Sequence, residues 1–273
     1  MIDLDSVSID LVDRDGDART IISDLSLTVT DGEFLTVVGP SGCGKTTVLR
    51  ALAGLVPASA GTIRIDGSPV TGPSELTAMV FQEFALLPWR SVLRNVELPL
   101  EARNLSKAER RARAMAALEQ VHLTHAAHRM PRELSGGMKQ RVGLARALAV
   151  DAKFLLMDEP FGALDPQVKR ILQATLLELW QGSTKTVVFV THDIDEAAIL
   201  SDRVVCLGSS PGVIREVVEV DVPRPRLTDD LEVTFAMETT AYRDRLWKLL
   251  SPDIRRANQE LTQGDAQQLA GQS

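Results

Sequence analysis

The fold of this chain is decided by the stretch GPSGCGKTT, residues 39–47. It matches the pattern G-x-x-x-x-G-K-[ST] and lies between an apolar run, residues 34–38, and a helix-like run, residues 47–53. Glycines let the backbone close around a phosphate chain, and N–H groups at a helix N-terminus bind the anion. A glycine-rich turn that binds nothing is the alternative, but the flanking strand and helix favour a phosphate-binding loop (P-loop).

Two side chains of this loop have predicted roles. Lys45 would reach the β- and γ-phosphates of a nucleotide, and the Thr46 hydroxyl would ligate Mg²⁺. The other residues of the loop are predicted to surround the nucleotide: Gly39, Pro40, Ser41, Gly42, Cys43, Gly44 and Thr47.

Length and composition are those of an ordinary globular protein, with 273 residues, 44% hydrophobic and 25% charged. The formal net charge of the chain is −7, whereas a nucleic-acid-binding protein usually has a broad basic surface. No nucleic-acid partner is therefore expected. Cys43 and Cys206 fall in the P-loop and in an apolar strand, so we expect no disulfide. The N-terminus is acidic and no apolar run approaches the roughly 18 residues that span a bilayer, which predicts a cytosolic protein able to dock on a membrane protein.

The sequence patterns predict strands in the first and last parts of the main domain and helices in the part of the chain between them. Strands are predicted at residues 2–12, 20–30, 33–38, 61–66, 76–81, 154–158, 186–192, 203–208 and 213–222. Helices are predicted at residues 47–53, 91–97, 106–121, 136–149, 166–180 and 194–200. The alternation of strands and helices predicts an α/β fold with right-handed crossovers and a parallel core sheet, into which a helical subdomain is inserted at about residues 83–150.

The C-terminal part is predicted to be a separate helical extension. The segment VPRPR marks a domain boundary at residue 226, and Thr228 can cap a helix that ends at Pro252. The apolar positions of that helix recur at helical spacing: Leu231, Phe235, Tyr242, Leu246, Leu249 and Leu250. We expect the extension, residues 227–262, to pack on the main domain, and residues 263–273 to be a disordered tail.

Two carboxylates end the apolar strand FLLMDEP, residues 154–160. A parallel sheet presents ligand groups at the carboxyl ends of its strands. Asp158 would hold the Mg²⁺ shell, and Glu159 would orient or deprotonate the water that attacks the γ-phosphate. Carboxylates that merely cap a helix are the alternative.

A second phosphate-binding helix start is predicted in LSGGMKQR, residues 134–141. Ser135, Gly136 and Gly137 would present N–H groups and a hydroxyl at the positive end of a helix. One chain therefore carries two helix starts suited to anions.

Together, the P-loop, the LSGG element and MDEP resemble the nucleotide-binding subunit of an ATP-binding-cassette (ABC) transporter, and the resemblance extends from about residue 3 to residue 226. It implies a P-loop NTPase fold with a mixed β-sheet core, N-terminal antiparallel strands and an inserted α-helical subdomain. It also implies ATP and Mg²⁺ as cofactors and ATP hydrolysis as the reaction.

The same resemblance extends to three further residues. Gln82 is similar to the glutamine that touches Mg²⁺ and water, Asp165 in Ala163-Leu164-Asp165 to the aspartate of the D-loop, and His192 to the switch histidine at the γ-phosphate. Each also has a local interpretation: Gln82 could end a strand, Asp165 could cap a helix, and His192 could be a buried core histidine.

The resemblance implies partners as well. ATP on one chain would be covered by the LSGG element of a second copy, and the dimer would drive a separate permease at the cytoplasmic face of the membrane, served indirectly by a solute-binding protein. The segment FALLPWRSVLRNVELPL, residues 84–100, and the VPRPR boundary resemble those of importers of nitrate, sulfonates, taurine and related small anions. Within the segment, Trp89 either contacts the permease or packs inside the helical subdomain.

A soluble ABC-type ATPase of translation or DNA repair is the alternative function. Such proteins usually carry two cassettes or long coiled-coil arms, whereas this chain has one cassette and no sustained heptads.

Three further patterns give weaker indications of function. His122, His125 and His128 have the spacing of a metal site, but they are better explained as surface or loop residues. The basic cluster around Arg110 and Arg111 is interleaved with glutamates and predicts a solvated helix face. Where the family usually has an aromatic residue that stacks on adenine, this chain has only aliphatic side chains, near Leu11 or Val12.

Overall fold

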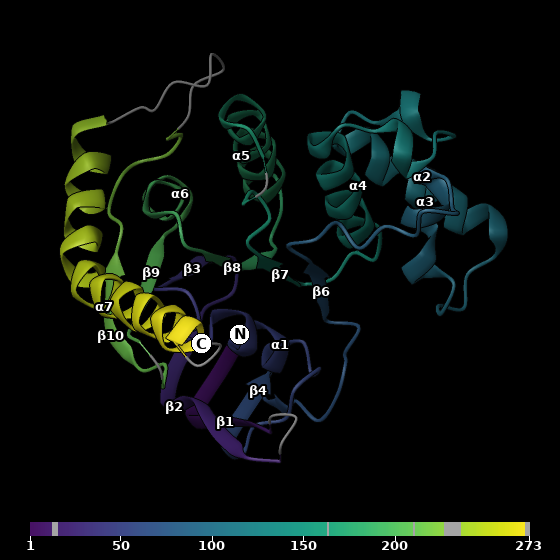
Figure 1. Cartoon of the computed structure of the whole chain (residues 1–273). Coiled ribbons are helices and arrows are strands. Elements are labelled where there is room, and N and C mark those ends of the chain that lie inside the picture. The colour runs from purple at the N-terminus through teal and green to yellow at the C-terminus, as the bar shows by residue number, and fades with distance from the viewer. Residues whose placement is uncertain (13–15, 163, 210, 227–235, 271–273) are drawn as a thin grey trace.

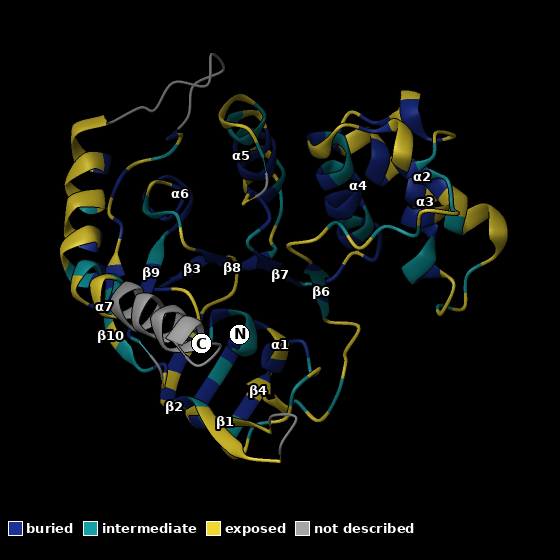
Figure 2. Cartoon of the chain, viewed as in Figure 1, coloured by how far each residue is buried: buried dark blue, intermediate teal, exposed yellow. Residues whose placement is uncertain are grey.

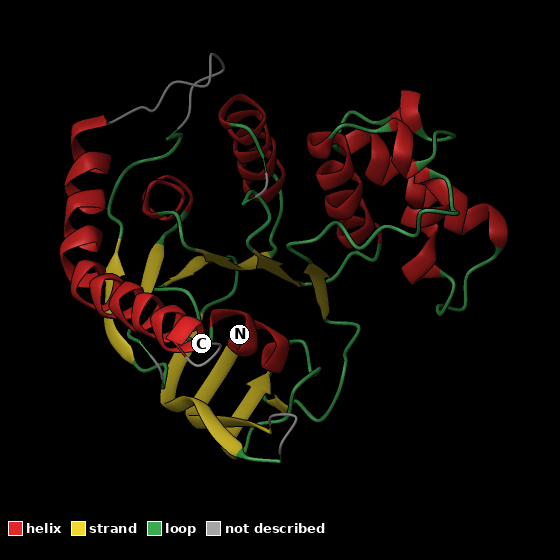
Figure 3. Cartoon of the chain, in the orientation of Figure 1, coloured by secondary structure: helices red, strands yellow, loops and turns green. Residues whose placement is uncertain are grey.

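Two β-sheets and the helices that cover them make up the described part of the chain (Figures 1 and 3). The computed structural model describes residues 1–12, 16–162, 164–209, 211–226 and 236–270, and side chains up to residue 256. The smaller sheet is antiparallel and has the strand order β2-β1-β4-β5. Its strands are β1 (Ile2–Val12), β2 (Ala18–Val29), β4 (Ala60–Ile65) and β5 (Ser68–Pro69).

The larger sheet has six strands in the order β10-β9-β3-β8-β7-β6. They are β3 (Phe34–Val38), β6 (Thr77–Val80), β7 (Phe154–Asp158), β8 (Thr186–Thr191), β9 (Arg203–Leu207) and β10 (Ile214–Glu219). All neighbouring pairs are parallel except β9 with β10. Strands β3, β7 and β8 are buried along their whole length, which explains why each is a continuous apolar run rather than an alternating one. The expected mixed-sheet core with N-terminal antiparallel strands is confirmed.

Apart from the C-terminal helix, the helices occupy three places around these sheets (Figure 1). Helix α1 (Lys45–Leu52) lies between the two sheets, and α5 (Pro166–Gln181) and α6 (Ile194–Leu200) cover the opposite face of the larger sheet. A lobe beyond β6 is entirely helical and matches the expected helical subdomain. It contains α2 (Val92–Glu97), η1 (Leu98–Leu100), α3 (Lys107–Gln120), η2 (Thr124–Ala126), η3 (Pro131–Glu133) and α4 (Gly136–Ala149).

The two faces of the larger sheet have separate apolar cores, which appear as dark blue layers in Figure 2. On the α1 side, Leu49 and Leu52 pack between strands of both sheets. On the other side, the ring of Phe34 meets that of Trp180 edge-on, with centroids 5.5 Å apart, and also contacts Phe189. The sheet is therefore held from both faces, and its strand ends have a rigid support.

The C-terminal helix α7 (Ala236–Ala270) packs along β9 and α6. Tyr242, Leu246 and Leu250 belong to an apolar cluster with residues of both elements, as expected for an extension that packs on the main domain. The predicted cap Thr228 and the apolar positions 231 and 235 lie outside the described residues.

The prediction that this helix ends at Pro252 is wrong, because Pro252 lies inside α7. A proline removes one backbone N–H and bends a helix without necessarily ending it, and the ribbon of α7 bends along its length (Figure 1). The helix continues to Ala270, through most of the segment for which a disordered tail was expected.

Several surface predictions can be compared with the structure. Trp89 is 71% exposed, so the alternative in which it packs inside the helical subdomain is wrong. Arg111 and Arg113 lie on the exposed face of α3, whose Ala114 and Leu118 are buried.

Cys43 and Cys206 are both buried and free. Among the described residues, the helices include none that is both long and apolar enough to cross a membrane.

Candidate functional site

Four predicted functional segments meet at one edge of the larger sheet because of its strand order. Strands β3, β8, β7 and β6 are adjacent and parallel, so their carboxyl ends point the same way. The P-loop follows β3, His192 follows β8, Asp158 ends β7 and Gln82 lies two residues beyond β6. Ligand groups gather at such an edge in open α/β sheets.

The P-loop joins β3 to α1 through a left-handed glycine. Gly44 precedes the first residue of α1 with φ of 96°, and a Cβ there would lie 2.6 Å from Ile22 Cδ1 and 2.9 Å from Ile21 Cγ2. Only glycine satisfies both the backbone angle and this close approach. The loop can therefore turn tightly and direct the first N–H groups of α1 toward an anion.

Inside the loop, Lys45 is buried and its ammonium group donates to the carbonyl oxygens of Gly39 (2.9 Å) and Pro40 (3.0 Å). Thr46 Oγ1 donates to Asp158 Oδ1 at 2.8 Å, which joins the P-loop to the end of β7. Burial raises the pKa of Asp158, and the Thr46 hydrogen bond only partly opposes this effect. A buried carboxylate of this kind is stabilised by a nearby cation.

Glu159 and His192 form a pair beside this loop that suits acid-base chemistry. His192 Nδ1 lies 2.8 Å from Glu159 Oε2, within hydrogen-bonding distance. Glu159 has a positive φ of 42°, which is uncommon for a residue with a side chain, and its N–H donates to Val190 O of β8 at 2.9 Å. Strained backbone conformations of this kind cluster at functional sites and persist where neighbouring structure holds them.

A cavity of about 470 Å³ lies beside the P-loop. The lining residues are Ile21, Ser41, Gly42, Gly44, Lys45, Thr46, Thr47, Gln82, Glu159 and His192. The structure therefore brings Gln82, Glu159 and His192 together with the P-loop, as the sequence predicted.

Ile21 was not predicted, and only the sheet arrangement reveals it. It belongs to β2, whose exposed and buried residues alternate without any sign of a ligand, and it lies beside the P-loop because β2 passes Gly44. Leu11 and Val12, where the family's adenine-stacking aromatic was sought, are 40% and 69% exposed and do not line the cavity.

The LSGG residues and Asp165 lie elsewhere, at the neighbouring starts of α4 and α5. Ser135 caps α4 by accepting a hydrogen bond from Met138 N, and Asp165 caps α5 by accepting one from Val168 N at 3.0 Å. A Cβ on Gly137 would lie 2.3 Å from Val168 Cγ1, so this glycine allows the two helix starts to pack together. The LSGG residues and Asp165 do not line the cavity, and residue 163 of the D-loop lies outside the described residues.

The residues at the P-loop suit Mg²⁺. The Thr46 hydroxyl and the buried Asp158 carboxylate are hard oxygen donors 2.8 Å apart, and the Gln82 side chain borders the same cavity. Mg²⁺ is usually held by one or two such groups together with water and substrate phosphates rather than by a protein cage. Elsewhere in the described part of the chain, no group of three or more His, Cys, Asp or Glu has the arrangement of a metal site.

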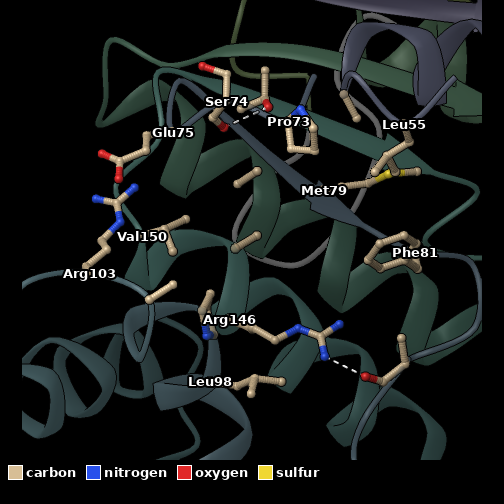
Figure 4. Close-up of a pocket in the computed structure, with 17 residues that line it drawn as sticks. Leu55, Pro73, Ser74, Glu75, Met79, Phe81, Leu98, Arg103, Arg146 and Val150 are labelled. Atoms are coloured by element: carbon tan, nitrogen blue, oxygen red, sulfur yellow. Dashed lines mark hydrogen bonds between the residues drawn. The ribbon is translucent and has the colours of Figure 1, made fainter. Parts of the chain in front are cut away.

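A second hollow, of about 670 Å³, lies between β6 and the helical subdomain (Figure 4). Leu55, Met79 and Phe81 lie along one side of it, and Leu98 and Arg146 lie across from them. Arg146 donates to the carbonyl oxygens of Phe84 and Ala85, so it also holds the segment that follows Gln82. Phe81 lines this apolar groove and Gln82, the next residue in the chain, lines the cavity at the P-loop.

Comparison with known proteins identifies the family. The model of the ABC transporter family matches residues 22–162, which is more than half of the chain and includes the P-loop, Gln82, the LSGG residues and Glu159. The chain belongs to the ABC transporter family. This ABC protein is an ATP-binding subunit and an ATPase of the ABC type.

Two curated relatives and one solved structure are similar to it. A taurine import ATP-binding protein of Yersinia pestis is 47% identical over 198 residues, which is 72% of this chain and 78% of the relative. A nitrate import ATP-binding protein of Synechococcus elongatus is 46% identical over 226 residues, 82% of this chain but only 34% of that longer protein. The dimeric, post-hydrolysis structure of an ATP-binding cassette with bound ADP and Pi has a TM-score of 0.72 and 31% identity, and covers 82% of this chain and 100% of that chain.

Proposed function

We propose that this chain is the ATP-hydrolysing subunit of an importer, which couples ATP binding and hydrolysis to uptake of a small organic or inorganic anion through a separate membrane permease. The observation that carries the proposal is the pair of Glu159 and His192, 2.8 Å apart at the rim of the P-loop cavity. Nucleotide binding alone requires no such pair, whereas hydrolysis requires a group that positions the attacking water.

The residues divide the work of phosphoryl transfer among them. Residues 39–47 bind the phosphates through backbone N–H groups, and Lys45 exchanges its carbonyl partners for the β- and γ-phosphates. Thr46, Asp158 and Gln82 would hold Mg²⁺, which when bound neutralises charge on the β- and γ-oxygens. Glu159 orients or deprotonates the attacking water, and His192 contacts the γ-phosphate while its Nδ1 keeps Glu159 in place.

A second copy of the chain completes the site. The start of α4 is formed by Ser135, Gly136 and Gly137, and none of them lines the cavity of its own chain. This supports a role in which they contact the nucleotide bound to a partner chain. The similarity to a dimeric cassette also supports a head-to-tail homodimer, in which Asp165 lies beside the LSGG residues at the interface. ATP favours the closed dimer because it contacts both chains there, and loss of the γ-phosphate removes that preference.

The permease is proposed to bind at the groove of Figure 4. An amphipathic helix can place apolar side chains against Leu55, Met79 and Phe81, and Arg146 links this groove to the segment just after Gln82. Trp89, 71% exposed on the same helical subdomain, is a further contact of the kind enriched at interfaces. Movement of the permease would then reach Gln82 directly.

The transported solute is proposed from the relatives. Import proteins for taurine and for nitrate are both similar to this chain, and both solutes are small and carry an anionic group. A solute-binding protein would deliver the solute to the permease, and this chain would be peripheral on the cytoplasmic face of the membrane. Selection of the solute belongs to those other subunits.

The proposal can be tested by purifying tagged wild-type and Glu159→Gln chains from detergent-solubilised membranes. Both should carry a permease with several membrane-spanning segments. Glu159→Gln should hydrolyse ATP roughly 10²- to 10⁴-fold more slowly, because it can no longer act as a base, and should accumulate as an ATP-bound dimer. Glu178→Gln is the matched control, since Glu178 is exposed on α5 and should leave hydrolysis unchanged.

Two results would contradict different parts of the proposal. Absence of any permease from both preparations would remove the importer role. Normal hydrolysis by Glu159→Gln would remove the assignment of Glu159 and leave the importer role intact.

A further inference from the structure

Lys169 makes a double ion pair that no step of the proposed mechanism uses. It lies one turn after the start of α5, and its Nζ is 2.5 Å from Asp193 Oδ2 and 2.7 Å from Glu196 Oε1. Asp193 directly follows His192, and Glu196 lies in the first turn of α6. The lysine therefore joins the helix that follows the D-loop to the turn that carries the switch histidine.

The turn itself is held by a chain of hydrogen bonds that ends at this lysine. Thr191 Oγ1 donates to Glu196 Oε2, and it accepts a hydrogen bond from Asp193 N at 3.0 Å. Asp193 Oδ1 in turn accepts from the N–H groups of Asp195 and Glu196 at the start of α6. The residues on both sides of His192 are thus tied to one another and to Lys169.

The charges of this cluster depend on the lysine. Glu196 is 2% exposed, and burial raises its pKa, opposed by the Lys169 ammonium and the Thr191 hydroxyl. Burial also opposes the ionisation of Asp193, but hydrogen bonds from Lys169 outweigh it and lower the pKa of that carboxyl. Without Lys169, two close carboxylates in a partly buried site would lose the ammonium group that pairs with both of them, which is strongly unfavourable.

The His192 side chain itself has few contacts that fix its position. This side chain is 59% exposed, and among the described residues its ring has a polar contact with Glu159 Oε2 alone. The position of the imidazole therefore follows the backbone of residues 191–193. A displacement of about 1 Å at a reacting group can lower a rate roughly 10²-fold.

From this geometry we propose that Lys169 is a positioning residue for ATP hydrolysis, which holds the turn of Thr191–Asp193 so that His192 meets Glu159 and the γ-phosphate. The proposal rests on the catalytic role proposed above for His192. Lys169 also adjoins Val168, which packs on Gly137 of the LSGG element, so the histidine turn and the LSGG helix start share the first turn of α5.

The test compares ATP hydrolysis by the full-length chain at protein concentrations that saturate its activity. Lys169→Met should lower kcat roughly tenfold to a hundredfold while KM for ATP changes by less than about threefold, because the P-loop is intact. Lys169→Arg should restore most of kcat, since a guanidinium can pair with two carboxylates. In the His192→Ala background, Lys169→Met should have no further effect, because it acts through that histidine.

Two variants serve as controls. Lys185→Met removes a lysine that pairs with Asp151 at the opposite end of β8, and it should leave kcat unchanged. Asp193→Asn cuts the link to Lys169 but keeps the Lys169–Glu196 pair and a good helix cap, so it remains informative if Lys169→Met fails to fold. It should lower kcat in the same way as Lys169→Met.

The proposal is overturned if Lys169→Met and Asp193→Asn keep the wild-type kcat. Equal losses from Lys169→Met with and without His192 would also overturn it, because they would indicate a general structural role. If His192→Ala alone retains full kcat, the proposed role of His192 fails, and the positioning role fails with it.

Discussion

At the scale of single residues, the glycines of the P-loop and of the LSGG element serve different purposes in this chain. Gly44 is required by its backbone angle and by the nearby Ile21 and Ile22 side chains. Gly137 sits in an ordinary helix, and its missing Cβ makes room for Val168 of α5. Helix packing therefore explains the glycine at this position of LSGG independently of the proposed anion binding.

This difference predicts that Gly137→Ala destabilises the fold by about 1–3 kcal/mol, because its Cβ would lie 2.3 Å from Val168 Cγ1. Chemical denaturation measures the change. Gly136→Ala is the matched control, since its Cβ would meet Leu164 Cδ2 at an ordinary 3.6 Å. Adding Val168→Ala to Gly137→Ala should recover part of the loss, and equal stability of the two single variants would refute the packing explanation.

At the scale of elements, the C-terminal helix α7 packs on the main domain and stabilises it. Its apolar face joins a cluster with β9, β10 and α6, and Asp253 accepts a hydrogen bond from Ser209 and pairs with Arg215. Arg243 of α7 lies 3.9 Å from Asp195 of α6, close to His192 in sequence. The helix therefore supports the outer edge of the sheet and the start of α6.

Leu246→Ala is expected to lower the free energy of unfolding by about 2–5 kcal/mol, since Leu246 is fully buried between α7 and the sheet. Denaturation and limited proteolysis of α7 give the measurement. Lys248→Ala, exposed on the same helix, should change stability by less than about 0.5 kcal/mol. Similar behaviour of the two variants would mean that α7 is not anchored by this contact.

At the scale of the whole molecule, the proposed mechanism assigns to one chain the halves of two different ATP sites. The P-loop cavity includes Lys45, Glu159 and His192 but none of Ser135–Gly137, which begin a helix elsewhere on the chain. A monomer should therefore bind ATP and hydrolyse it poorly.

The corresponding prediction concerns dilution. ATPase activity per chain should fall as the protein is diluted below its dimer dissociation constant, because each site loses the LSGG residues of its partner. Activity measured over a dilution series, with ATP binding measured in parallel as the control, tests this. Constant activity per chain at all concentrations would show that a single chain is sufficient.

Much of the site could be predicted because its signals are local. The P-loop glycines and the carboxylates after the apolar run of β7 each depend on a short stretch of chain, whereas the histidine after β8 was predicted only from the resemblance to the ABC family. Element types followed from apolar periodicity for the same reason. The end of the last helix was misplaced because a proline is compatible with a bent helix when tertiary contacts hold both sides of it.

By itself, the sequence determined most element types, the P-loop and the two carboxylates that follow the apolar run of β7, since neighbouring residues encode these through backbone angles and periodicity. Only the tertiary structure decided the strand order β3-β8-β7-β6, which brings the P-loop, His192, Glu159 and Gln82 to one cavity. It also decided the contact of Ile21 with the P-loop and the link from Lys169 to Asp193. These arrangements join residues far apart in the chain, and they depend on how all the buried faces pack together at once.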